Sequence, residues 1–259
     1  GARVAAVDLS AEGLAETVRL AAAPEGRIST HVMSVSDRAA VEALPDQVEV
    51  LVLSGSGDLQ ASGNGAANTL IGNSGANRLD GGGGADTLIG GAGNDHYSVD
   101  SADDLVIELA GGGTDTISTS VSLTALPDHV EVASLNSSAS LALVGNSLAN
   151  LLVGNRGSDT LNGGAGADTL DGGRGNDLYV LDQSGDVVIE APRAGSDVVL
   201  SSVTTTLGDN VEHLTLLDAG GAINAPCPCR SRARGRRRAR RPQHLLVPAV
   251  RHSTPHLPR

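Results

Sequence analysis

The apolar residues of the segment 63–107 recur with a period of nine. Each of the first four nonamers places one leucine or tyrosine at its eighth position, where the fifth has Val106, and a segment rich in glycine and asparagine fills the first six positions of those four. A single inward side chain between two outward neighbours is typical of a short β-strand, whereas glycine favours a tight turn. The pattern therefore predicts a six-residue turn followed by a three-residue strand in every nonamer.

The same array recurs further along the chain, over 145–189. In both arrays four clear nonamers are followed by a degenerate fifth, and alternating, β-type segments follow at 106–123 and 188–205. An array and its alternating segment together form one repeat unit. Tandem repetition of this kind predicts an all-β fold, a parallel β-roll or β-solenoid built from two nonapeptide arrays. Two nonamers would form one coil, so that every second nonamer stacks on the same edge.

Composition and charge indicate which residues would form the core of this fold and how acidic its surface would be. The chain contains no Phe, Trp or Lys and only two Tyr, so the core must come from Leu, Val, Ile and Ala. Residues 46–225 hold 30 of the 34 glycines, and 24 acidic residues against four arginines. The absence of lysine excludes catalysis by a side-chain amine. No stretch approaches the roughly 20 apolar residues of a membrane helix, and the sequence shows no N-terminal signal peptide.

The sixth position of the nonamers carries the candidate chemistry. It is Asp in five of the eight clear nonamers and Asn in the other three, and the degenerate nonamers keep an Asp there. Stacked turns would lie about 4.8 Å apart, and like carboxylates at that spacing repel by roughly 1 kcal/mol per pair in water. Cations between the turns would offset this repulsion. Because carboxylate and carbonyl oxygens are the available ligands, calcium is favoured over zinc or copper.

The nonamers GGGGADTLI and GGAGNDHYS at 81–98 resemble the calcium-binding nonapeptide of the RTX (repeats-in-toxin, haemolysin-type) proteins. In that family the sixth-position Asp and the turn carbonyls hold calcium between successive turns of a parallel β-roll. The resemblance implies a secreted, extracellular calcium-binding module that folds with calcium and has no catalytic role of its own. By the resemblance, the metal-binding residues are Asn77, Gly81, Gly82, Gly84, Asp86, Gly90, Gly91, Gly93, Asp95, Asp104, Asp159, Gly163, Gly164, Gly166, Asp168, Gly172, Gly173, Gly175, Asp177 and Asp186. Asn68, Asn77 and Asn150 could ligate without charge, so those ends of the arrays would bind more weakly or serve as caps.

Residues 1–44 suggest a second class of function. They predict a β-α-β-α unit, with strands at 3–9 and 28–35 and helices from 11 to about 22 and from 36 to before Pro45. The segments GARVAAVDLSAEGLAETV and HVMSVSDRAAVEAL resemble part of a short-chain dehydrogenase, in which Asp8 would contact the cofactor ribose. The Gly-rich phosphate loop and the Tyr-x-x-x-Lys pair of that family are absent. We therefore expect a truncated, catalytically incomplete fragment, joined to a repeat region over 45–225.

The last segment, 226–259, suggests a third class. It contains ten arginines, six prolines and no acidic residue, which predicts disorder and would allow electrostatic binding of nucleic acid. The repeat pattern starts a third unit at 207 and stops abruptly before this segment, as a change of reading frame would produce. We favour that explanation and expect no nucleic-acid partner. His96, His129 and His213 share no register and are expected at the surface, and Tyr97 and Tyr179 are expected to pack at the ends of the arrays.

Overall fold

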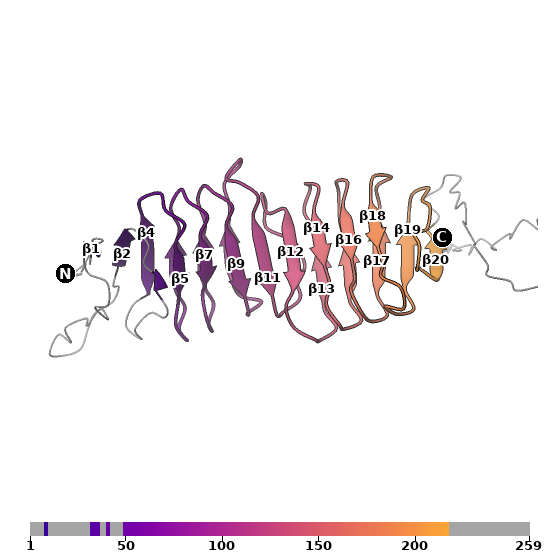
Figure 1. Cartoon of the computed structure of the whole chain (residues 1–259), viewed down its shortest axis with the longest axis horizontal. Helices are drawn as coiled ribbons and strands as arrows, with labels where there is room; N and C mark the ends of the chain where they lie inside the picture. The colour runs from indigo at the N-terminus through magenta and orange to yellow at the C-terminus, as the bar shows by residue number, and fades with distance from the viewer. Residues whose placement is uncertain (1–7, 10–31, 37–39, 42–48, 218–259) are drawn as a thin grey trace, which may run out of the picture.

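The computed structural model describes residues 8–9, 32–36, 40–41 and 49–217, which form an elongated parallel β-solenoid (Figure 1). Every strand pairing among them is parallel, as the nonamer pattern predicts. The six-stranded sheet contains β1 (Asp8–Leu9), β2 (Val32–Ser36), β4 (Val50–Ser54), β6 (Thr69–Ile71), β8 (Thr87–Ile89) and β10 (Leu105–Ile107). The part of the chain that the structure describes has no helix that is long and apolar enough to cross a membrane.

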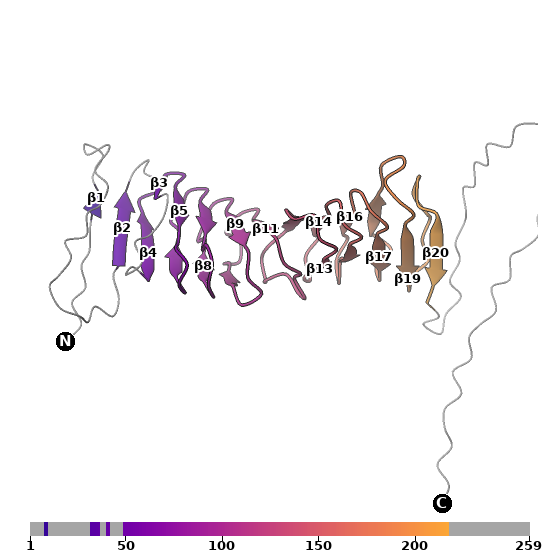
Figure 2. The same cartoon turned by 90° about the horizontal axis from the view of Figure 1, so that it is seen from below.

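The nine-stranded sheet joins the two arrays into one solenoid. It contains β3 (Ala40–Val41), β5 (Gln60–Ser62), β7 (Arg78–Asp80), β9 (His96–Val99), β11 (Thr116–Thr119), β12 (Val132–Leu135), β14 (Leu151–Val153), β16 (Thr169–Asp171) and β18 (Val187–Ile189). Its strands alternate along the chain with the six-stranded sheet in the first array and with a five-stranded sheet in the second (Figure 2). The five-stranded sheet contains β13 (Ala142–Val144), β15 (Thr160–Asn162), β17 (Leu178–Leu181), β19 (Val198–Ser201) and β20 (His213–Leu216).

Strand register follows the nonamers inside each array and departs from them between the arrays. Thr69 pairs with Thr87, which holds the same nonamer position one coil later. In β11, by contrast, Thr116 pairs with His96 of β9 and with Val132 of β12, and neither step equals two nonamers. On the opposite face, an isolated bridge joins Leu123, in the segment that connects β11 to β12, to Leu143 of β13 in the five-stranded sheet. As a result, β6 and β14 occupy equivalent positions of the repeat and yet lie in opposite sheets.

The core is a ladder of the eighth-position side chains. All eight are 0% exposed, because each short strand turns its middle residue inward: Leu70, Leu79, Leu88, Tyr97, Leu152, Leu161, Leu170 and Tyr179. The nonamer pattern therefore predicts the core correctly. The two tyrosines close their arrays and are as deeply buried as the leucines.

The described N-terminal residues contribute strands to the same sheets. Asp8–Leu9 and Val32–Ser36 lie in the segments predicted as strands, but Ala40–Val41 forms a strand where a helix starting at Ser36 was expected. That prediction is wrong for these residues, because pairing with β5 satisfies their backbone groups instead. Strand β2 pairs with β4 across the expected boundary near residue 44. The predicted helix at 11–22 and the segment 226–259 lie outside the described residues.

Candidate metal sites

The sixth-position side chains stack on the solenoid edges and are linked by hydrogen bonds. In each case the backbone amide of a sixth-position residue donates to the side-chain oxygen of its counterpart one coil later. The donor–acceptor pairs are Asn68 to Asp86 (2.7 Å), Asn77 to Asp95 (2.6 Å), Asp86 to Asp104 (3.0 Å), Asn150 to Asp168 (2.8 Å), Asp159 to Asp177 (2.7 Å) and Asp168 to Asp186 (3.2 Å). The structure thus brings together the pairs that a coil of two nonamers predicts.

The second position of each nonamer divides the turns into two types. In turns that begin Gly-Asn, the backbone amide of the Asn donates to the sixth-position side chain of the same turn, as Asn155 does to Asp159 at 3.0 Å. In turns that begin Gly-Gly, the second glycine has a positive φ, which is +77° at Gly82. Its amide therefore points elsewhere and donates to Asp80 of the preceding strand at 3.2 Å. In a Gly-Asn turn the sixth-position side chain therefore accepts a hydrogen bond from the second-position amide of its own turn. In a Gly-Gly turn it accepts none from that amide, and we call such a side chain open.

Each of the four Gly-Gly turns consequently holds a buried carboxylate oxygen with no hydrogen-bond partner. These are the Oδ2 atoms of Asp86, Asp95, Asp168 and Asp177, and none of these residues is more than 1% exposed. The other three predicted Asp ligands differ in this respect. Asp104, Asp159 and Asp186 each accept backbone hydrogens with both carboxylate oxygens.

Backbone carbonyl oxygens face the same turns. A methyl group added at Gly82 would overlap the carbonyl oxygen of Asn64, and one at Gly84 would lie 2.8 Å from that of Ala66. The other glycines at the second and fourth positions of Gly-Gly turns also face carbonyl oxygens one coil earlier: Gly91, Gly93, Gly164, Gly166, Gly173 and Gly175. A methyl group added at any first-position glycine of these turns would overlap the Asp carboxylate of its own turn: Gly81, Gly90, Gly163 and Gly172. Carboxylate and carbonyl oxygens in this arrangement fit a hard cation such as calcium.

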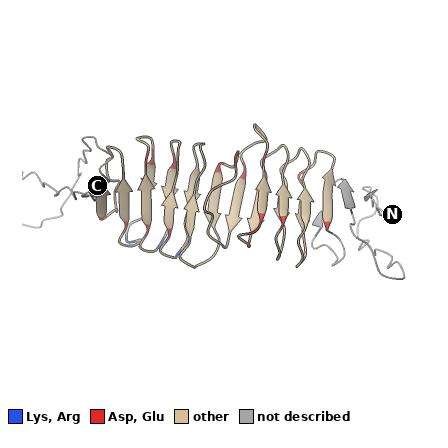
Figure 3. Cartoon of the chain, turned by 180° about the vertical axis from the view of Figure 1, so that it is seen from behind, with Lys and Arg blue, Asp and Glu red and all other residues tan. Residues whose placement is uncertain are grey.

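The electrostatics of the turns favour a bound cation. Acidic residues recur near the strand ends along the solenoid (Figure 3). Burial raises the pKa of Asp86, Asp95 and Asp177 to about 6, although a backbone hydrogen bond partly lowers each value. Neighbouring carboxylates such as Asp104, which lies beside Asp86, raise the pKa further. Ionised carboxylates are thus disfavoured in these turns without a compensating positive charge.

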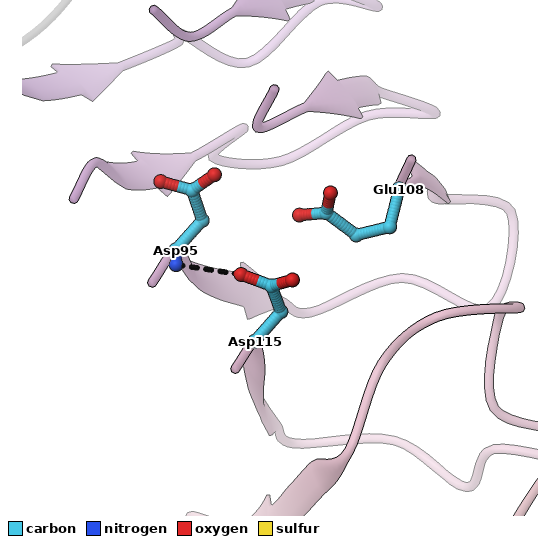
Figure 4. A group of neighbouring side chains, drawn as sticks. All are labelled: Asp95, Glu108 and Asp115. Atoms are coloured by element: carbon cyan, nitrogen blue, oxygen red, sulfur yellow. Dashed lines mark hydrogen bonds between the residues drawn. The ribbon is translucent and has the colours of Figure 1, made fainter. Parts of the chain in front are cut away.

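The structure adds four acidic residues that the sequence reasoning missed. Glu108 and Asp115 converge with Asp95, so that one carboxylate oxygen of each lies within 4.8 Å of the others (Figure 4). Glu190 and Asp197 converge in the same way with Asp177. The signal was present in the sequence, because Asp115 and Asp197 each precede a short β-segment just as a nonamer Asp does. The turns that lead to Asp115 and Asp197 are longer than a nonamer turn, so a strict nine-residue template does not find these two residues.

Comparison with protein families agrees with this geometry. The fold and its stacked acidic turns define a parallel β-solenoid with cation-binding edges. The model of the RTX calcium-binding nonapeptide repeat matches residues 62–97 and 144–179, which hold the four clear nonamers of each array. No curated protein and no solved structure matches the chain. The dehydrogenase and nucleic-acid hypotheses gain no support from these comparisons.

The open geometry of a Gly-Gly turn can be tested with two neighbouring glycines. Replacing Gly82 with Ala should lower the free energy of unfolding by about 1–3 kcal/mol and weaken calcium binding, because Gly82 has a positive φ and faces a carbonyl oxygen. Replacing Gly83 with Ala should be neutral or slightly stabilising, since nothing lies within 4 Å of the added methyl group. Urea unfolding at saturating calcium and calorimetric titration measure both effects. Equal losses in the two variants would contradict this account of the turn.

Proposed function

We propose that the repeat region is a secreted, extracellular calcium-binding module whose folding is coupled to calcium, and that its role is structural rather than catalytic. The observation that carries the proposal is the set of buried, unpartnered carboxylate oxygens in the Gly-Gly turns, whose second- and fourth-position glycines face backbone carbonyl oxygens of the preceding coil. An oxygen in this position has lost its water and gained no donor. A calcium ion between successive turns would supply the missing partner.

The coupling to folding follows from the same geometry. An ion that binds only the folded chain stabilises it by about 2.7 kcal/mol when its concentration is 100 times the dissociation constant. Several such sites together match the roughly 5–15 kcal/mol that stabilise a typical domain. Where calcium is scarce the buried carboxylates oppose folding, and where it is plentiful they favour it. The family resemblance supports a switch that acts on export, because calcium is abundant outside the cell.

Circular dichroism with chelator, magnesium or calcium tests the proposal at neutral pH. We expect a strong β-signal in millimolar calcium and its loss in chelator. Magnesium should restore little of the signal, because it requires near-ideal octahedral geometry and keeps several of its waters. A β-signal and melting temperature that are the same in all three solutions would refute the proposed function.

A further inference from the structure

We propose that each of the two repeat units ends in a second kind of cation site, made of three side-chain carboxylates. The residues are Asp95, Glu108 and Asp115 in the first unit, and Asp177, Glu190 and Asp197 in the second. Glu108, Asp115, Glu190 and Asp197 lie outside the segments that match the repeat family. The proposal rests on the proposed function only in taking a hard, calcium-like cation as the ligand.

A lengthened turn creates the site. The segment 108–115 joins β10 to β11 and is longer than a nonamer turn, which accounts for the pairing of Thr116 with His96 in place of a step of two nonamers. Glu108 occupies the position that a glycine holds one coil earlier, at Gly90, and its Oε1 would lie 2.6 Å from a methyl group added at Gly90. The side chains of Asp95, Glu108 and Asp115 point toward one another (Figure 4).

The hydrogen-bonding state of the cluster points to a ligand. The Oδ2 atoms of Asp95 and Asp115 are buried without a partner, and each of these residues is 1% exposed. In the second unit the same holds for Asp177 and Asp197, and Oε2 of Glu190 is unpartnered as well. The cluster therefore occurs once in each repeat unit, at equivalent positions and with the same unsatisfied aspartate oxygens. Three converging carboxylates with these open positions match the oxygen-rich coordination of a hard divalent or trivalent ion.

Tyrosine hydroxyls position the glutamates. The hydroxyl of Tyr97 donates to Oε1 of Glu108, and that of Tyr179 donates to Oε1 of Glu190. In the second unit the Tyr179 hydroxyl also accepts the Gly172 amide hydrogen at 2.9 Å, which fixes its place. These two residues are the only aromatic side chains among Phe, Tyr and Trp in the entire chain. Each site thus has its own tyrosine beside it.

The position of the sites in the fold indicates what a bound ion would do. Strand β10 is the last strand of the six-stranded sheet, and Glu108 follows it directly. Asp95 and Asp115 precede β9 and β11 of the opposite, nine-stranded sheet. The second unit repeats this relation at its own terminal strand, β18. An ion in each site would bind ligands from both sheets and so hold the terminal strand of one sheet, β10 or β18, against the opposite sheet.

Tyrosine-sensitised terbium luminescence tests the proposal with the full chain. Terbium takes oxygen ligands as calcium does, and energy transfer from tyrosine reports ions close to Tyr97 or Tyr179. Removing an outer-shell partner of a metal ligand costs about 10–100-fold in affinity, so loss of a direct ligand should cost at least as much. We expect Glu108→Gln with Glu190→Gln to raise the terbium midpoint at least tenfold. Each single variant should lose about half of the emission at two equivalents of terbium, and Asp115→Asn should reproduce Glu108→Gln.

The control pair is Asp128→Asn with Asp209→Asn, which removes the same charge at exposed positions and should leave the midpoint unchanged. Both glutamine variants retain an oxygen for the tyrosine hydroxyl, and circular dichroism in calcium verifies their fold. A double glutamine variant whose midpoint stays within twofold of the original protein would overturn the inference, while a calcium-induced β-signal in that protein leaves the proposed function standing. An original protein that shows no calcium response would instead refute the proposed function.

Discussion

With calcium chelated, the solenoid should lose stability as the pH rises from about 4 to about 8. The cause is the buried carboxyl groups, whose pKa values in the fold lie above those of an unfolded chain. The pKa is about 6 for Asp86, Asp95 and Asp177, and desolvation is the largest cause in each case. It is about 7 for Glu108 and Glu190, again mainly through burial.

The direction of the effect follows from proton binding. Below about pH 4 these groups are protonated in both states and cost the fold nothing. Between about pH 4 and 8 the unfolded chain has already released protons that the folded chain retains, so stability falls as the pH rises. Above about pH 8, where Glu108 and Glu190 are ionised in the fold as well, the full penalty applies. One pKa unit corresponds to about 1.4 kcal/mol, and even after discounting for solvent screening several groups together can reach the stability of a typical domain.

Thermal melts followed by circular dichroism in chelator, at pH 4, 5, 6, 7 and 8, measure this dependence. We expect the melting temperature to fall across the series and the β-signal to be weak at neutral pH. The same series in millimolar calcium serves as the control and should show the opposite slope, because only deprotonated carboxylates bind the ion. A melting temperature that rises with pH in chelator would contradict the assignment of these buried carboxyl groups.

Replacing Asp86 and Asp168 with Asn should have opposite effects with and without calcium. In chelator at neutral pH the variant should be more stable than the original chain, by about 1–3 kcal/mol for Asp86 and in the same direction for Asp168, because a buried charge is removed at each site. In calcium it should bind fewer ions and melt at a lower temperature. The turn tolerates the new residue, since Asn already holds the sixth position at 68, 77 and 150.

The matched control for this experiment is again Asp128→Asn with Asp209→Asn, two exposed positions outside the nonamer turns. It changes the net charge equally and should shift stability by less than about 0.5 kcal/mol in either solution. The decisive observation is that the variant with Asn at 86 and 168 is more stable than the original chain in chelator and less stable than it in calcium. A variant that is less stable in both solutions would show that Asp86 and Asp168 act through packing or hydrogen bonds and not through an ion.

The local periodicity of the sequence predicts most of the fold. The eighth-position residues such as Leu88 and Leu161 form the core, and the stacking of every second nonamer follows from a coil of two nonamers. The sequence could not predict that equivalent strands of the two arrays lie in opposite sheets, because this depends on how the segment 120–131 packs across the solenoid. The strand at Ala40–Val41 was missed because its local pattern favours a helix, whereas pairing with β5 decides its conformation.

The candidate sites were predicted in part. Every nonamer Asp that is open in the structure was among the predicted ligands, since the GGxGxD motif marks these positions. Sequence alone did not separate them from Asp159, because the difference lies in the direction of one backbone amide, set by Gly or Asn at the second position. Glu108 and Asp115 were missed because the sites they form require a turn that breaks the nine-residue period.

Amide hydrogen exchange at neutral pH, with and without calcium, tests the central claim most directly. The claim is that ions in the stacked turns hold the solenoid together, so protection should appear where those turns and strands lie. We expect peptides from 63–107 and 145–189 to exchange rapidly in chelator and to become strongly protected in calcium. Equal protection of these two segments in both solutions would contradict the claim, because the fold would then persist without its ions.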